Sequence, residues 1–115
     1  MNRLTMAILL VFLATTTALA ANHVFTGQIM DSMCAPMGNH NAGYKMTGTH
    51  TPRACTLACV KSGAKFVLYN AATKTIYKLD NQVKPRAFAG ENVKVIGTFN
   101  RTSKTIHVVK IGAAR

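Results

Sequence analysis

Acidic residues are nearly missing from this chain of 115 residues, which has three of them against 14 lysines and arginines and a net charge of +11. The three are Asp31, Asp80 and Glu91, too few to suggest a hydrolase that works with paired carboxylates. The sequence also lacks a Ser/His/Asp array, a P-loop and a GxGxxG motif. These absences predict a protein that is not an enzyme.

Long apolar runs are missing too. A membrane-spanning helix needs about 20 apolar residues, and residues 6–14 form an apolar run that is much shorter. This run follows Arg3 and precedes Ala18-Leu19-Ala20, which has the small residues of a signal-peptidase site. We therefore expect residues 1–20 to be a signal peptide cleaved after Ala20. The mature protein is then secreted or periplasmic in a bacterium, and it does not span the membrane.

The basic residues are spread from Lys45 to Arg115 without a run or a stripe. Such a surface attracts anionic partners, so an anionic envelope component or a polysaccharide is a candidate partner. Nucleic acid is not expected in vivo, because the predicted signal peptide exports the chain. The expected state is a monomer.

Residues 21–115 are long enough for a single small domain, and their pattern is mainly β. Hydrophobic alternation and turn residues predict strands at 24–33, 66–69, 75–79, 92–99 and 105–111, with a short helix or turn at 82–89. This order favours a five-stranded, OB-like (oligonucleotide/oligosaccharide-binding) Greek-key barrel. Phe66, Tyr69 and Tyr77 on its middle strands can stack on a ligand, although Phe66 and Tyr77 are better explained as core residues.

All three cysteines lie in a predicted insertion, residues 34–63, after the first strand. Its first part ends in a Gly- and Thr-rich linker before residue 51. Thr51 then suits a helix N-cap, and Pro52 suits the first helical position. A helix over residues 53–61 places Cys55 and Cys59 four residues apart on one face.

That spacing favours a metal site over a disulfide between the two helical cysteines. Their Cβ atoms would lie about 5–6 Å apart, whereas a disulfide needs about 3.8 Å and one metal ion can bind both thiolates. Cys34 is the natural third ligand, with His40 or His50 as the fourth. The alternatives are a Cys34 disulfide to Cys55 or Cys59, which an oxidising compartment favours, or a thiol-transfer role. A disulfide-stapled basic module would bind an anionic polymer instead of a metal.

The predicted metal is one zinc or copper ion. Soft sulfur ligands favour Cu(I), and Met33, Met37 and Met46 lie in loop-like sequence where Met33 and Met37 can add to a copper site. Zinc fits equally well if the ligands are only Cys34, His40, Cys55 and Cys59. Asp31 is expected outside the ligand set, where it orients a ligating histidine or caps the turn before Cys34.

Several short motifs together resemble a group of small secreted bacterial proteins. In that group a D-S-x-C-G/A motif and a histidine precede C-x3-C, a Gly-rich segment and a V-x-V-x-G tail. The matching residues here are Asp31-Ser32-Met33-Cys34-Ala35, His40, Cys55-x3-Cys59, Gly63-Ala64-Lys65 and Val93-Lys-Val-Ile-Gly97. The resemblance spans nearly the whole mature chain. It implies an OB-like barrel and the ligand set Cys34, His40, Cys55 and Cys59, but it implies no activity.

Overall fold

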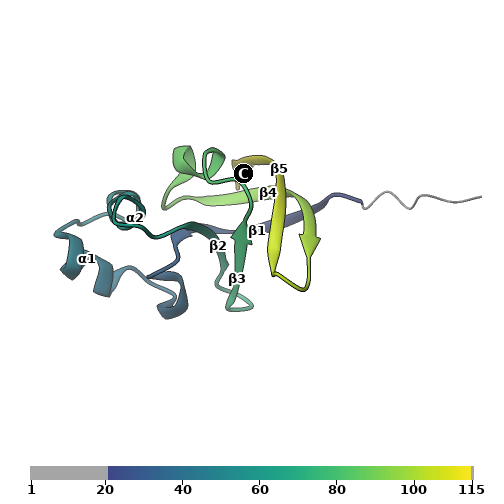
Figure 1. Ribbon diagram of the computed structural model, residues 1–115. Helices are drawn as coiled ribbons and strands as arrows, with labels where there is room; N and C mark the ends of the chain where they lie inside the picture. Colours follow the sequence, from purple (N-terminus) through teal and green to yellow (C-terminus); the bar gives the residue numbers. More distant parts are fainter. Residues whose placement is uncertain (1–20, 115) are drawn as a thin grey trace, which may run out of the picture.

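The computed structural model describes residues 21–114, so the predicted signal peptide at residues 1–20 lies outside the described part. The fold is mainly β, as predicted, with five strands joined edge to edge into a ring (Figure 1). The strands are β1 (His23–Asp31), β2 (Phe66–Asn70), β3 (Thr75–Leu79), β4 (Asn92–Asn100) and β5 (Thr105–Ala113). They pair in the order β1-β2-β3-β5-β4, and β4 pairs back with β1.

Strand β1 closes the ring by pairing with two other strands, β4 and β2. Its first part pairs with β4, and its last part pairs with β2, where Asp31 lies opposite Phe66. Near the end of the first part lies Gly27, which pairs with Val93 of β4 and where a Cβ atom would come within 2.4 Å of the Tyr69 carbonyl oxygen. Only glycine allows the two backbones to approach this closely. The strand that closes the ring therefore also delivers Asp31 to the end of the sheet.

The interior of the ring is a continuous apolar core. Alternate residues of β4, including Val93 and Val95, are fully buried, as expected for a strand with one face inward. They pack with a set of aliphatic and aromatic side chains from the other strands and from the segment between β3 and β4: Ile29, Phe66, Leu68, Leu79, Ala89, Ile106, Val108 and Ile111. Burial of Phe66 agrees with its prediction as a core residue and removes it from any ligand-stacking role.

An insertion of residues 33–64 stands beside the ring and carries its own helices (Figure 1). Its two ends are tied together, because Ser32 and Lys65 exchange two hydrogen bonds of 2.8 and 3.0 Å. It contains the short helix η1 (Ala35–Met37), α1 (Asn41–Thr47) and α2 (Pro52–Lys61). The predicted linker before residue 51 is therefore wrong over 41–47, which form α1. The first strand also ends two residues earlier than predicted.

Helix α2 is anchored to the segment that follows β3. That segment contains the short helix η2 (Lys84–Phe88) and then Gly90, which has a φ of 77°. A Cβ atom on Gly90 would lie 2.5 Å from the backbone nitrogen of Arg53, so glycine is required for the contact. The Arg53 guanidinium also donates to the Ala87 carbonyl at 3.1 Å. Among the described residues, no helix has the length and apolar character to cross a membrane.

Candidate metal centre

The turn after β1 positions the first two residues of the centre. Asp31 ends the strand and is fully buried. Its Oδ2 atom accepts hydrogen bonds from the backbone nitrogens of Met33 and Cys34, both at 3.0 Å. A carboxylate that accepts from residues two and three positions later holds the chain in a tight turn. This turn ends β1 and directs Cys34 back toward the aspartate.

Helix α2 supplies the other two cysteines. Thr51 caps the helix by accepting a hydrogen bond from the Ala54 nitrogen at 3.1 Å, and Pro52 opens it. Both features are as predicted. Cys55 and Cys59 lie four residues apart on the buried face of this helix, with exposed fractions of 0% and 1%. The helix therefore presents two thiols to the turn that carries Asp31 and Cys34.

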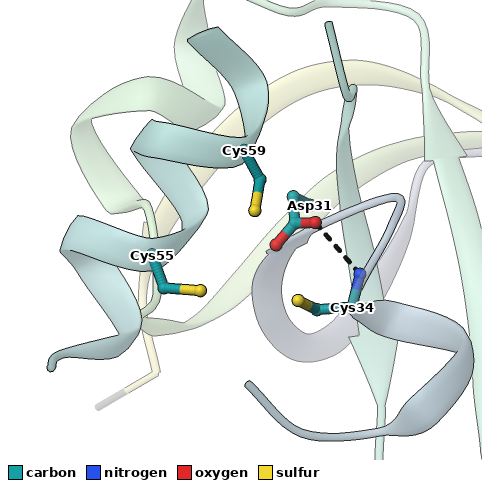
Figure 2. A group of neighbouring side chains, drawn as sticks. All are labelled: Asp31, Cys34, Cys55 and Cys59. Carbon is teal, nitrogen blue, oxygen red and sulfur yellow. Dashed lines mark hydrogen bonds between the residues drawn. The ribbon is translucent and has the colours of Figure 1, made fainter. Parts of the chain in front are cut away.

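The four side chains converge from opposite sides on one point (Figure 2). One carboxylate oxygen of Asp31 and the sulfurs of Cys34, Cys55 and Cys59 all lie within 4.8 Å of one another, and all four residues are buried. All three cysteines are free thiols. Four donors this close are able to hold one metal ion. The structure thus brings together the three predicted cysteines and adds Asp31, which was expected only beside the ligand set.

Helix α1 covers two of the sulfurs. A Cβ atom on Gly43 would lie 2.5 Å from the Cys55 sulfur and 2.7 Å from the Cys34 sulfur. No side chain fits at this position unless the sulfurs move. The centre is also the core of the insertion, because the cysteines pack in one buried cluster with Met30, Ala35, Ala64 and Val67.

Burial and nearby charge disfavour ionised thiols in the metal-free centre. Burial is the largest cause, and the Asp31 carboxylate and the Cys55 thiol add to it; together they raise the pKa of Cys34 to about 11. The same causes, in the same order, raise the pKa of Cys59 to about 12. These thiols therefore keep their protons at neutral pH. A metal ion that bound them would have to displace those protons, so its affinity would rise with pH.

The raised pKa values predict that the metal-free protein loses stability in alkali. A thiol with a higher pKa in the folded state binds its proton more tightly there than in the unfolded chain. Its stabilising contribution is complete below about pH 9 and is lost as pH rises toward the folded-state values of about 11 and 12. We expect a loss of about 3 kcal/mol between pH 8 and pH 10 from the two thiols together.

Urea unfolding in the presence of a chelator measures this loss. A variant with Cys34→Ser and Cys59→Ser serves as the control, because it keeps every other titrating group. An equal loss in this variant would show that the thiols are not its source.

His40 is buried beside the centre but outside the group of four. It is 6% exposed and stacks on Tyr44, with 5.9 Å between ring centroids. Neither of its ring nitrogens has a hydrogen-bond partner in the described part of the chain, and the same is true of Asp31 Oδ1. Burial lowers the pKa of His40, against a smaller opposing effect of the Asp31 charge, so the imidazole is neutral at pH 7. Unpartnered buried polar atoms are costly, and these three need a partner.

The remaining predicted ligands lie at the surface. His50 is exposed, and Met33 and Met37 have exposed fractions of 44% and 61%. Met46 is more exposed still, at 73%. None of them belongs to the buried group of four. Met30 is fully buried and packs in the cluster around the cysteines, as the strand prediction implied.

Comparisons with known proteins add nothing to this geometry. The resemblance to small secreted bacterial proteins stays a prediction, and the function of the centre has to be inferred from its own donor atoms. No protein-family model, curated protein or solved structure matches the chain.

Proposed function

We propose that the protein binds one zinc ion through Asp31, Cys34, Cys55 and Cys59 and uses it to hold the insertion in its folded form. One observation carries the proposal: four buried donor atoms lie within 4.8 Å of one another, and three of them belong to free cysteines. Buried free cysteines are common as small apolar residues. Three of them packed around a buried carboxylate are not explained by packing alone.

Zinc is favoured over copper by the chemistry of the fourth donor. Zinc accepts both thiolate and carboxylate ligands in a four-coordinate site, whereas Cu(I) prefers soft sulfur ligands. The soft ligands that would complete a copper site, Met33 and Met37, are exposed. Cu(I) bound by the three thiolates alone is the second candidate, and the ion that co-purifies distinguishes the two.

Asp31 is the proposed fourth ligand, with His40 in a supporting role. Oδ2 of Asp31 already accepts two backbone hydrogen bonds, but Oδ1 has no hydrogen-bond partner among residues 21–114. A metal ion would satisfy that oxygen. The Asp31 charge acts on the neutral His40. His40 would be the fourth ligand if the carboxylate stayed outside the shell, which is the ligand set Cys34, His40, Cys55 and Cys59 predicted from the sequence.

The proposed ion is structural, and the protein is not an enzyme. Four protein ligands complete a tetrahedral zinc shell and leave no open position for a substrate. The barrel that carries the insertion is proposed to be OB-like, which the ring order β1-β2-β3-β5-β4 and the short helix between β3 and β4 support. The proposed location remains the bacterial periplasm or the secreted fraction. There, a zinc ion would keep the thiols from oxidation.

Native mass spectrometry of the mature protein, purified without chelator, tests the proposal. We expect one zinc ion per chain, lost on acidification, after which all three thiols react with an alkylating agent. A metal-free mass that is two hydrogens light, with one reactive thiol, would show a disulfide and sink the proposal. A co-purified copper ion would reassign the metal and keep the site.

Two single variants identify the fourth ligand. Asp31→Asn is expected to lower zinc affinity about 100-fold, because it removes a ligand charge, while His40→Ala is expected to lower it about tenfold or less. The reverse order would place His40 in the shell and Asp31 beside it. Cys59→Ser binds no zinc in either case, and His50→Ala is the matched surface control that changes nothing.

A further inference from the structure

A second feature lies away from the metal centre, between the two β-hairpins. The hairpins β2–β3 and β4–β5 end in turns at the same side of the ring (Figure 1). Strands β3 and β5 pair in parallel over only two residue pairs, Lys78 with Thr105 and Leu79 with Ile106. Beyond these pairs the hairpins diverge and leave a hollow of about 770 Å³. We call this hollow the hairpin cleft.

Basic side chains surround the hairpin cleft. Its lining includes Lys74, Lys78, Arg101 and Lys104, all of them exposed, and no acidic residue. Among residues 21–114 the only ion pair joins His107 to Asp80, so the four cations are not neutralised by a neighbouring carboxylate. Four like charges around one hollow repel one another, and an anion that entered would relieve the repulsion.

Both turns that border the cleft are built in the same way. The sequences Asn-Ala-Ala-Thr-Lys-Thr-Ile at 70–76 and Asn-Arg-Thr-Ser-Lys-Thr-Ile at 100–106 match at four of seven positions. In the first turn, Asn70 Oδ1 accepts from the nitrogens of Ala72 and Thr73 at 3.0 and 3.2 Å. In the second, Asn100 Oδ1 accepts in the same way at 3.0 and 3.1 Å.

The fifth residue of each turn is a lysine in the left-handed backbone region. Lys74 and Lys104 both have a φ of 53°, and they are the only such non-glycine residues in the described part of the chain. Glycine takes this conformation without steric cost, whereas a residue with a Cβ does not. Lysine at both positions therefore works against folding. Glycine would relieve the backbone at both positions but has no charged side chain. Both lysine side chains line the cleft, so their charge explains why lysine stands at these positions.

The wall of the cleft is aromatic. Tyr77 and Phe99 line it and pack edge to face, with an interplanar angle of 83°. Phe25 packs against both rings, so the pair does not present the successive flat platforms on which nucleobases stack. Hydroxyl groups of Thr75, Thr102 and Ser103 complete the lining. The two aromatic rings offer a small apolar surface for the face of a sugar ring. The hydroxyls can hydrogen-bond to its hydroxyl groups, and the basic side chains can pair with its carboxylate.

We propose that the hairpin cleft binds an anionic polysaccharide. The carboxylates of the sugar chain pair with the four cations, and a sugar ring packs against Tyr77 and Phe99. Lys74 and Lys104, held on opposite turns, contact the chain from its two sides. This site is independent of the metal centre.

Calorimetric titration with an alginate-derived tetrasaccharide tests the proposal. Binding is expected to weaken as salt rises, because it depends on exposed charges, and a neutral tetrasaccharide of the same length is expected not to bind. The decisive variant combines Lys74→Gly with Lys104→Gly. Glycine relieves the left-handed backbone, so this protein should fold at least as stably as the wild type and yet bind about tenfold more weakly.

A matched variant, Lys94→Gln with Lys110→Gln, removes the same charge from strands β4 and β5 outside the cleft. It is expected to keep nearly the wild-type affinity. An equal loss in both variants would mean attraction to overall charge and would overturn the proposal. Tighter binding of a thymidine hexanucleotide at the same residues would also overturn it in favour of single-stranded nucleic acid. Cys59→Ser is expected to abolish zinc binding and leave polysaccharide binding unchanged. The zinc proposal and the polysaccharide proposal can therefore fail independently of each other.

Discussion

Removal of the proposed zinc ion by a chelator is expected to make the insertion open locally far more often, without unfolding it completely, and to leave the ring of strands unchanged. The cluster at the centre of the insertion has seven buried residues, and three of them are the cysteines. Zinc contributes about 10–16 kcal/mol to the folding of small zinc-binding peptides, so a cluster of this size is expected to be much less stable without the ion. The ring has its own apolar core of ten buried residues, none of them a metal ligand.

Hydrogen–deuterium exchange with and without chelator measures the effect. Amides of α1 and α2 are expected to lose at least about 100-fold in protection, whereas those of β4 and β5 change little. A variant with Cys55→Ser and Cys59→Ser should resemble the chelated protein whether or not zinc is added. If the chelator leaves the exchange rates of α2 amides unchanged, no ion stabilises the insertion. If exchange rates rise equally in α2 and in the ring, the ring depends on the ion as well.

Replacing Gly43 by alanine is expected to lower zinc affinity about 100-fold. The added carbon would lie 2.5 Å from one sulfur and 2.7 Å from another, so sulfurs or helix must move. Metal sites tolerate deviations of only about 0.2 Å in their ligand distances. Intrinsic helix propensity acts in the other direction, since alanine is favoured over glycine by about 1 kcal/mol within a helix. Weaker zinc binding by the Gly43→Ala variant would therefore come from the steric clash with the sulfurs and not from a less stable helix.

Competition with a chromophoric zinc chelator provides the affinity. Gly112→Ala is the matched control, because a Cβ atom there meets nothing within 4 Å and the residue does not have a positive φ. It should bind zinc like the wild type. A Gly43→Ala protein with full zinc affinity and higher stability would show that α1 does not rest on the sulfurs.

Local sequence rules predicted the parts of the centre that local interactions create. Thr51 and Pro52 start α2 through a cap and a preset backbone angle, both of which follow from residue type. The four-residue spacing then places Cys55 and Cys59 together. Strand alternation likewise predicted the five strands, because one face of each strand is buried in the ring.

Tertiary contacts created the parts that were missed. Helix α1 contains a glycine that disfavours helix, and Gly43 is explained only by the sulfurs that lie against it. Asp31 was expected as a turn cap, and one of its oxygens does cap the turn. The other oxygen points toward the cysteines (Figure 2), which include two residues of α2 far from Asp31 in the chain. The OB-like topology, His40 as a ligand and the export of the chain stay predictions.

The short helix α1 has a consequence for the lifetime of a bound ion. All four donors are buried, so an ion can leave only when some part of its cover moves. Helix α1 has seven residues, fewer than the about 12–15 that an isolated helix needs to persist in water. Its helical form therefore depends on its packing, and it lies directly against two of the sulfurs. Tight equilibrium binding at this centre is therefore compatible with rapid exchange, at a rate set by how often α1 lifts from the sulfurs.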